Sequence, residues 1–232
     1  MKISKNKLNV VLDIGKTNVK LIFLKNDKIV KEYKTKQQNG SYRNSIKTLK
    51  SGKIIIWLIE KLKKESKKNI LENFVCTTHG CSLAFIGFDN KELIACTDYE
   101  YSFDKYKKEF LKVEPKFSTS FTPLLEGGLN TGLQIFYLSK KFPNVLKKTK
   151  YILSYPQYVA WKLSKTYSTE ITYVGCHSYL WDFKKNKYSQ LTKKLSVEKK
   201  FPPIKKAWEI IGDLKINNKK INILNGVHDS NA

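Results

Sequence analysis

The sequence predicts an α/β protein in which a mixed β-sheet is flanked by helices. Apolar runs rich in β-branched and aromatic residues open the chain, an amphipathic helical segment follows them, and another apolar strand comes after the helix. The chain has 232 residues, of which 41% are hydrophobic. That is enough for one large or two small domains whose core needs neither disulfides nor metals.

The opening segments are expected to form an antiparallel meander of three strands. Residues 8–14 and 19–24 are apolar runs, and residues 28–35 alternate in polarity after a turn at Asn26-Asp27. The alternation is that of strands with one buried face.

A helix and a buried strand are predicted next. Over residues 55–68, apolar side chains recur at helical spacing with lysines opposite them, and residues 73–78 form a short strand. The resulting β-β-β-α-β order is the pattern of the ribonuclease-H/actin-like ATPase fold.

The rest of the chain is expected to mix strands and helices. The predicted elements are a hairpin of residues 82–88 and 92–96 closed at Asp89-Asn90, a helix over 131–141, a strand over 151–154, a helix over 157–164, and a strand over 222–227. Asn130 or Thr131 is the expected N-cap of the helix over 131–141, which ends before Pro143.

The charge balance is strongly basic. Lys and Arg number 44 against 20 Asp and Glu, which gives a net charge of +24. However, Arg43 is the only arginine, and the lysines are spread over nearly every segment. Because base and phosphate recognition generally uses arginine forks, we expect weak non-specific affinity for polyanions but no specific nucleic-acid partner.

Other classes of protein are disfavoured by composition. The longest apolar stretches, such as residues 54–59, are far shorter than the roughly 20 residues of a membrane helix, and the apolar run within residues 1–11 is too short for a signal peptide. Three histidines make a zinc site improbable, and the four cysteines show neither CxxC spacing nor disulfide-rich density: Cys76, Cys81, Cys96 and Cys176. We therefore expect a cytoplasmic protein without a membrane partner.

The segment Asp13-Ile14-Gly15-Lys16-Thr17-Asn18 is the first candidate site. It is not a P-loop, because Val10 stands where that motif needs glycine and a strand follows instead of a helix. It can instead form a tight hairpin whose turn offers Lys16, Thr17 and backbone N–H groups to a phosphate, with Asp13 near Mg²⁺. A plain β-turn with a solvated aspartate is an equally open interpretation.

Two further segments follow predicted strands. Thr77-Thr78-His79-Gly80 ends a buried strand, where open α/β sheets place ligands, although a lone histidine is more often structural. The second segment, Gly226 to Ala232, carries Asp229 just past a buried strand, at a helix start. A carboxylate held there can take a proton from a hydroxyl that is being phosphorylated, whereas helix capping is the ordinary role of an isolated aspartate.

Together these residues resemble the N-terminal half of an FGGY-family carbohydrate kinase. The segment from Val10 to Lys20 is similar to that family's first phosphate motif, and the segment from Gly226 to Ala232 resembles its catalytic-aspartate motif. Residues 142–163 and Tyr179-Leu180-Trp181-Asp182 resemble the stretches between them. The resemblance covers essentially the whole chain, and we take residues 1–232 as the family's N-terminal sugar-binding domain.

The resemblance implies ATP-dependent phosphorylation of a sugar hydroxyl, with ATP and Mg²⁺ as cofactors and a small sugar as substrate. Asp229 would be the general base, Asp13 the metal-associated carboxylate, and the phosphate-binding residues would be Gly15, Lys16, Thr17 and Lys20. The sugar pocket would be lined by Thr78, His79, Gly80, Gln157 and His228. The His-Asp pair and the Leu129-Asn130-Thr131 segment look closest to the rhamnulokinase and fuculokinase branch, which implies a six-carbon deoxy-ketose.

The length of the chain departs from the family. Its members carry a second domain that binds the nucleotide, and this C-terminal domain is absent from the 232 residues. We therefore expect a sugar-binding half with little or no kinase activity by itself. The surface shared with the absent domain would be exposed, so self-association, for example as a homodimer, is expected.

Two alternatives remain from other classes of protein. One is a non-catalytic, regulatory sugar-binding protein of the actin-like ATPase superfamily. The other is a basic nucleic-acid-binding domain of ribonuclease-H shape. The latter fold groups several carboxylates around two metal ions, whereas only Asp13 stands in a suitable place on the opening strand.

Overall fold

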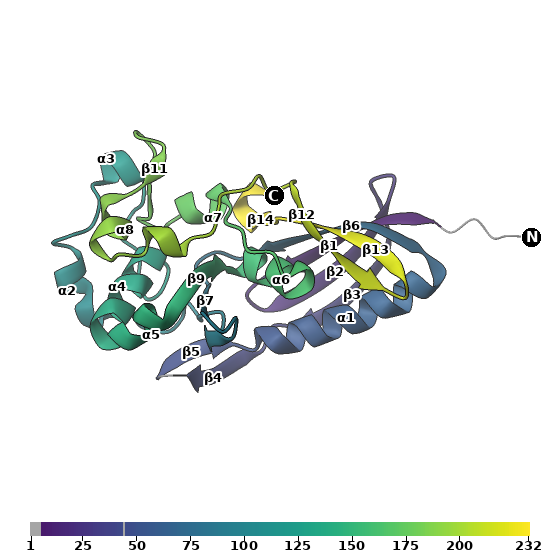
Figure 1. Cartoon of the computed structure of the whole chain (residues 1–232), viewed down its shortest axis with the longest axis horizontal. Helices are drawn as coiled ribbons and strands as arrows, with labels where there is room; N and C mark the ends of the chain where they lie inside the picture. The colour runs from purple at the N-terminus through teal and green to yellow at the C-terminus, as the bar shows by residue number, and fades with distance from the viewer. Residues whose placement is uncertain (1–5, 44) are drawn as a thin grey trace, which may run out of the picture.

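A mixed six-strand path forms the main sheet of the protein. A computed structural model describes residues 6–43 and 45–232. The path runs β12-β13-β6-β1-β2-β3, and the short strand β14 also pairs with β6 (Figure 1). The strands of this sheet are β1 (Lys7–Ile14), β2 (Asn18–Lys25), β3 (Lys28–Lys36), β6 (Ile70–Thr78), β12 (Ile210–Ile216), β13 (Lys219–Leu224) and β14 (Val227–His228). The α/β class with a mixed sheet is thus confirmed.

The first three strands form the predicted antiparallel meander. In β1, Val10, Leu12 and Ile14 are buried, while the residues between them are more exposed, as expected for a strand with one covered face. The turn between β2 and β3 is made by Asn26 and Asp27, whose φ angles are 48° and 62°. Asn and Asp tolerate this left-handed conformation better than other non-glycine residues, which explains the turn at this position.

Parallel pairing begins at β6, which lies between β1 and β13. β6 runs parallel to β1 over its whole length, and β13 and β14 run parallel to β6 on its other side. A ladder of amide side chains crosses these strands: Asn222 donates to Asn73, and Asn73 donates to Asn9, over 3.1 and 3.0 Å. The carboxyl ends of β1, β6 and β14 therefore lie at one edge of the sheet.

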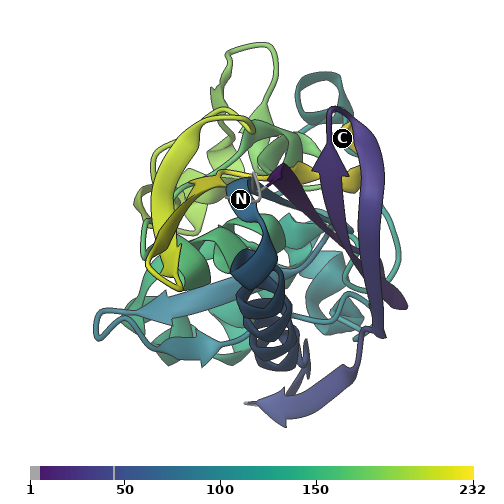
Figure 2. The ribbon, with the colours of Figure 1, turned by 90° about the vertical axis from the view of Figure 1, so that its right-hand side faces the viewer.

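Two helices cover one face of the sheet. α1 (Ser51–Lys68) buries Ile54, Leu58 and Leu62 against it, and α6 (Tyr155–Ser164) packs into the same core. Figure 2 shows α1 running along one side of the twisted strands. This burial of apolar side chains fixes the sheet and hence the strand ends that carry the candidate site.

A second hydrophobic core lies beyond α6, in the part of the molecule at the left of Figure 1. It is built around the three-stranded sheet β8-β7-β9, made of β7 (Leu83–Gly87), β8 (Glu92–Ile94) and β9 (Thr149–Ser154). Short helices surround it: α2 (Lys107–Phe110), α3 (Phe117–Ser120), α4 (Thr131–Lys141), α5 (Pro143–Lys148), α7 (Ile171–Gly175) and α8 (Gln190–Lys194). The remaining elements are the hairpins β4 (Asn39–Arg43) with β5 (Ile46–Leu49) and β10 (Trp181–Asp182) with β11 (Lys187–Tyr188), and three short 3₁₀ helices over Asp104–Tyr106, Glu198–Lys200 and Asp229–Asn231.

Most predicted elements are confirmed with shifted ends. The helix predicted over residues 131–141 is found over the same residues, and the predicted hairpin at Asp89-Asn90 is β7 with β8. The helix expected from residue 55 begins at Ser51, and the strand expected over residues 222–227 is divided into β13 and β14. The sequence did not predict β4, β5 or β12.

Candidate functional site

Three strand ends bring the predicted site residues to one edge of the main sheet. Ile14 of β1 and His228 of β14 both lie in register with Thr78 of β6, on opposite sides of it. Parallel neighbours are about 4.8 Å apart, so the ends of β1 and β14 are about 10 Å apart across β6. The turn after β1, the segment after β6 and Asp229 thus share one edge of the sheet.

The turn after β1 is tight. The Gly15 N–H donates to the carbonyl oxygen of Asn18 over 2.9 Å, and Lys16 and Thr17 are the residues between them. The Thr17 side chain is exposed. The turn therefore presents a free hydroxyl at the edge of the sheet, which suits contact with a phosphate.

Asp13 and Lys20 lie directly opposite one another on β1 and β2. Their side chains belong to the face of the sheet that α1 and α6 leave uncovered, because Leu12 and Ile14 point into the core. On the other side of Asp13, Thr77 of β6 lies in register with it, and its buried hydroxyl has no partner among the described residues. Asp13 therefore lies between a lysine and a threonine on the neighbouring strands, close to the turn.

Lys16 does not extend freely into solvent. Its ammonium forms an ion pair with the fully buried carboxylate of Asp98 and another with Glu100 at 3.3 Å, and it lies 4.5 Å from the centre of the Tyr99 ring. Lys47 pairs with the other oxygen of Asp98 at 3.0 Å. Burial would raise the pKa of Asp98, but hydrogen bonds from the two lysines outweigh it and hold that pKa below its ordinary value.

His79 is buried beside this cluster, with 7% of its surface exposed. Its backbone N–H donates to Ile14 O over 2.8 Å, which ties the segment after β6 to β1. Its ring packs edge-on against Tyr99 and Tyr155. Burial lowers the pKa of His79, so its imidazole is neutral near pH 7.

The protonation of His79 follows from its neighbours. Nδ1 lies 2.9 Å from the carbonyl oxygen of Gly80, which only accepts, so Nδ1 carries the proton. Nε2 is then an acceptor, and this buried atom has no partner among the described residues. A hydroxyl group that donates to Nε2 would satisfy it.

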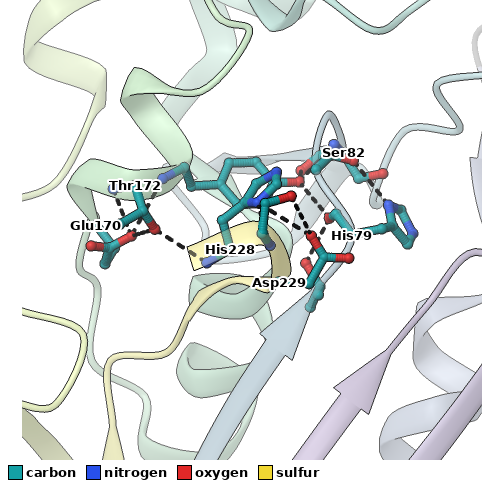
Figure 3. Close-up of polar contacts among 10 residues, drawn as sticks. His79, Ser82, Glu170, Thr172, His228 and Asp229 are labelled. Carbon is teal, nitrogen blue, oxygen red and sulfur yellow. Dashed lines mark hydrogen bonds and ion pairs between the residues drawn. The ribbon is translucent and has the colours of Figure 1, made fainter. Parts of the chain in front are cut away.

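Asp229 begins the 3₁₀ turn that follows β14, and its carboxylate is 42% exposed (Figure 3). His228 Nδ1 lies 3.2 Å from Asp229 Oδ1 and accepts the Ser230 N–H over 3.1 Å. Since Nδ1 accepts that N–H, the proton of the neutral ring is on Nε2. Burial lowers the pKa of His228, in agreement with a neutral ring beside the carboxylate.

Gly80 is required by this packing. A Cβ placed on Gly80 would lie 2.3 Å from His228 Nε2, a distance that no real contact allows. Gly80 and His228 are therefore in direct contact, which joins the segment after β6 to the segment after β14.

Two residues predicted to line the sugar pocket are buried in the supporting structure. Thr78 is fully buried and donates its hydroxyl proton to the carbonyl oxygen of His79. Gln157 is also fully buried: its Nε2 donates to the carbonyl oxygens of Asn225 and Gly226, and its Oε1 accepts from Ser154. In this arrangement Gln157 fixes the chain just before β14 instead of presenting its amide to solvent.

Asn130 is at the predicted N-cap position of α4, but it does not cap the helix through its side chain. It accepts from the N–H of Leu125 and donates to the carbonyl oxygens of Pro123 and His177. Asn130 therefore cross-links two loops, which a local sequence pattern does not reveal.

Asp98, Lys47, Glu170 and Thr172 adjoin the site and were not singled out from the sequence. Asp98 meets Lys16 across 82 positions of the chain, and Thr172 meets His228 across 56. The available signal for Asp98 was an acidic residue two positions after the second strand of a predicted hairpin. The sequence signal for Glu170 was weaker: it is an acidic residue that precedes a short, mainly apolar segment over residues 171–174.

The residues near the turn could hold a magnesium ion only together with other ligands. Over residues 6–43 and 45–232, no group of three or more His, Cys, Asp or Glu side chains is arranged to hold a metal. Mg²⁺ typically keeps several waters and binds one or two carboxylates together with substrate phosphates. The half-buried carboxylate of Asp13, next to the turn, fits that limited role.

The fold is that of the carbohydrate kinases, and several solved members match the chain along nearly its whole length. A carbohydrate kinase from Novosphingobium aromaticivorans superimposes with a TM-score of 0.90 at 26% identity, over 98% of this chain and 50% of that one. A ligand-bound xylulose kinase from Lactobacillus acidophilus superimposes with a TM-score of 0.80 at 16% identity, over 96% of this chain and 48% of that one. A Plasmodium falciparum glycerol kinase with ADP superimposes with a TM-score of 0.79 at 15% identity, over 98% of this chain and 50% of that one.

The chain thus spans about half the length of the solved kinases that it matches. These similarities show that the chain has the actin-like ATPase fold of these kinases. No protein-family model and no curated protein matches the sequence. Among the described residues, no helix is both long and apolar enough to cross a membrane.

Proposed function

We propose that this chain is the sugar-binding half of an ATP-dependent carbohydrate kinase in which Asp229 is the general base. The observation that supports this most is the common edge of β1, β6 and β14, which brings together a tight turn, a buried neutral histidine and a partly exposed aspartate. This edge occurs in a fold that matches carbohydrate kinases over 98% of the chain.

Asp229 would act on the hydroxyl group of the sugar. Transfer of a phosphoryl group to a hydroxyl needs an acceptor for the proton that the hydroxyl loses. Asp229 is at the edge of the sheet with an exposed carboxylate, and its backbone is held by β14 on one side and the 3₁₀ turn on the other. The Ser230 hydroxyl donates to that carboxylate over 3.4 Å and helps to orient it.

His79 would select the sugar by a single hydrogen bond. Its Nε2 is a buried acceptor, so a sugar hydroxyl that donates to it satisfies both groups, whereas a compound lacking that hydroxyl leaves it unpaired. Within this proposal the substrate is a six-carbon deoxy-ketose of the rhamnulose or fuculose type, as the sequence resemblance implies.

The phosphate would lie at the turn after β1. The Thr17 hydroxyl and the Lys20 ammonium would contact it, and Asp13 would hold Mg²⁺, which neutralises charge on the phosphate groups of ATP when it is bound. We further propose that the adenosine of ATP is held by a domain outside these 232 residues. The chain alone would then bind sugar but transfer phosphate slowly or not at all.

Calorimetry and a phosphorylation assay test this function. We would titrate the chain with L-rhamnulose, L-fuculose, D-xylulose, D-gluconate and glycerol, and then assay each compound that binds with ATP and Mg²⁺. Binding of one or more of them is expected, with little turnover. If none of the five binds, the proposal that this chain binds a sugar is refuted. Turnover at an ordinary kinase rate of about 10 per second would refute the proposal that a second domain is needed.

Asp229→Asn tests the base directly. In single-turnover measurements, any phosphoryl transfer by the unaltered chain should fall about 10²- to 10⁴-fold, because the proton acceptor is lost, while sugar affinity stays within about threefold. Asp27→Asn, in the exposed turn at the opposite edge of the sheet, is the matched control and should leave both quantities unchanged. Transfer that survives in Asp229→Asn would remove Asp229 as the base.

One observation favours a second function. The ammonium of Lys16, the cation of the turn, is already paired with the carboxylates of Asp98 and Glu100. A turn whose cation is paired in this way would bind phosphate weakly, which suits a regulatory sugar-binding protein without kinase chemistry. Sugar binding with no detectable release of ADP, even from a preparation that includes a nucleotide-binding partner, would support this alternative.

A further inference from the structure

A buried acidic side chain lies behind the segment that carries Asp229. Glu170 is only 2% exposed, and it accepts hydrogen bonds at the start of α7 from the N–H groups of Thr172 and Tyr173, over 2.8 and 3.3 Å. It also accepts the hydroxyl proton of Thr172. A glutamate is rarely so buried unless its oxygens are bound, and these three donors are what compensate its burial.

The Thr172 hydroxyl links Glu170 to the backbone of His228 by two hydrogen bonds. A hydroxyl group has one proton, and an ionised carboxylate can only accept, so the Thr172 proton points toward Glu170. The oxygen is then left to accept, and the backbone N–H of His228 donates to it over 3.2 Å. Figure 3 shows the chain of contacts from Glu170 through Thr172 to His228, with Asp229 adjoining.

Tyr173, the next residue of α7, joins the same segment to the loop between β6 and β7. The Tyr173 ring packs edge-on against the His228 ring, with 5.4 Å between the ring centres. Its hydroxyl accepts from the Ser82 N–H over 2.7 Å and donates to the Ser82 carbonyl oxygen over 3.0 Å. The start of α7 thus contacts both β14 and the segment after β6, which together carry part of the proposed sugar site.

We propose that Glu170 and Thr172 are positioning residues that fix the backbone of His228 and thereby the place of Asp229. β14 is only two residues long, and Asp229 follows it directly, so the pairing with β6 provides little support by itself. The hydrogen bond from His228 N–H to Thr172 supplies a support from the opposite side. The functional meaning of this support rests on the proposed role of Asp229 as the base.

Amide hydrogen exchange of the intact chain tests the proposal. Thr172→Val keeps the shape of the side chain but removes the acceptor, so the His228 amide should exchange about tenfold faster. Thr172→Ser restores the hydroxyl and should stay within about threefold of the unaltered chain. Glu170→Gln keeps an acceptor oxygen but no longer fixes the hydroxyl proton, so its effect should lie between these two.

The matched control is Thr131→Val. Thr131 is also buried, but its hydroxyl has no partner among the residues that the structure describes, and it lies in α4. This variant should leave His228 exchange unchanged. Amides of the central strand β1 serve as the internal reference, because a general loss of stability would accelerate them as well.

Two outcomes would overturn the proposal. One is a His228 amide in Thr172→Val that exchanges no faster than in Thr131→Val. The other is a crystal structure of Thr172→Val in which the Asp229 backbone stays within about 0.5 Å of its original place, which is the tolerance of a catalytic group. If Asp229→Asn retained transfer while His228 exchange responded as expected, the role of Asp229 would fail but the positioning of its segment would stand.

Discussion

At the scale of single residues, the buried Asp98 carboxylate depends on compensating charges for its stability. It is fully buried and balanced by two ammonium groups, those of Lys16 and Lys47, whose side chains are 21% and 23% exposed. A buried carboxylate is stable only with such partners, and removing one member of the group leaves the others uncompensated. Asp98 therefore couples the turn after β1 to the segment after β8.

Asp98→Asn should destabilise the chain at pH 7 by about 2–4 kcal/mol, as measured by urea unfolding. The folded state lowers the pKa of this carboxyl, so its contribution is present above the unfolded value near 4 and is lost as the pH falls through the lower, folded value. The difference between the two proteins should consequently shrink below about pH 4. Glu100→Gln is the control, since that side chain is 51% exposed and should change stability by less than about 1 kcal/mol.

The sequence could predict a site residue where strand order alone determines its place. His79 and Asp229 follow apolar runs, and parallel strands bring such positions to one edge. Asp98 and Glu170 could not be predicted, because their roles depend on partners 82 positions away and on a second contact through Thr172. The burial of Gln157 was missed for the same reason: its partners, Asn225 and Gly226, are set by tertiary packing.

At the scale of elements, the connection between β13 and β14 determines where Asp229 lies. The strand predicted over residues 222–227 is interrupted there, because Asn225 and Gly226 leave the ladder and the chain resumes as β14. Gly226 has a φ of 86°, and a Cβ on it would lie 2.6 Å from the Cys76 carbonyl oxygen. Only glycine fits both the backbone conformation and the close approach to β6.

Two glycine substitutions separate this requirement from a general effect of adding a methyl group. Gly226→Ala should destabilise by more than about 1–2 kcal/mol and reduce sugar binding, because the backbone must shift before β14. Gly52→Ala lies near the start of α1 with no atom within 4 Å of its Cβ, and should stabilise by up to about 1 kcal/mol. Thermal unfolding measures both. A Gly226→Ala protein as stable as the unaltered chain would contradict the interpretation of this connection.

Periodicity explains which elements were predictable. The meander, α1 and α4 have apolar residues at the spacing of a half-buried strand or a helix, and each was found. β12 has only one buried residue, Ile216, and includes Gly212, so its sequence carries no clear alternation. β12 is held by pairing with β13, and the turn between them uses Asn217 and Asn218 with φ angles of 49° and 60°.

At the scale of the whole molecule, the lysines that give the net charge of +24 are spread along the chain. The edge strand β3 is an example, with four of its nine residues lysine: Lys28, Lys31, Lys34 and Lys36. Charged lysines on an edge strand discourage pairing with another chain, so part of this charge has a structural explanation. The same lysines also attract any polyanion without reading its sequence.

Duplex DNA should therefore bind this protein weakly and without sequence preference. Because such binding comes from released counterions, its affinity should fall more than about tenfold between about 50 and 200 mM salt, as measured by fluorescence anisotropy. Binding of an uncharged sugar releases no counterions, so its affinity should stay within about twofold over the same range. Two duplexes of scrambled sequence should bind equally at each salt concentration. A preference for one duplex that persists at 200 mM salt, together with no sugar binding, would favour the nucleic-acid-binding domain over the kinase half.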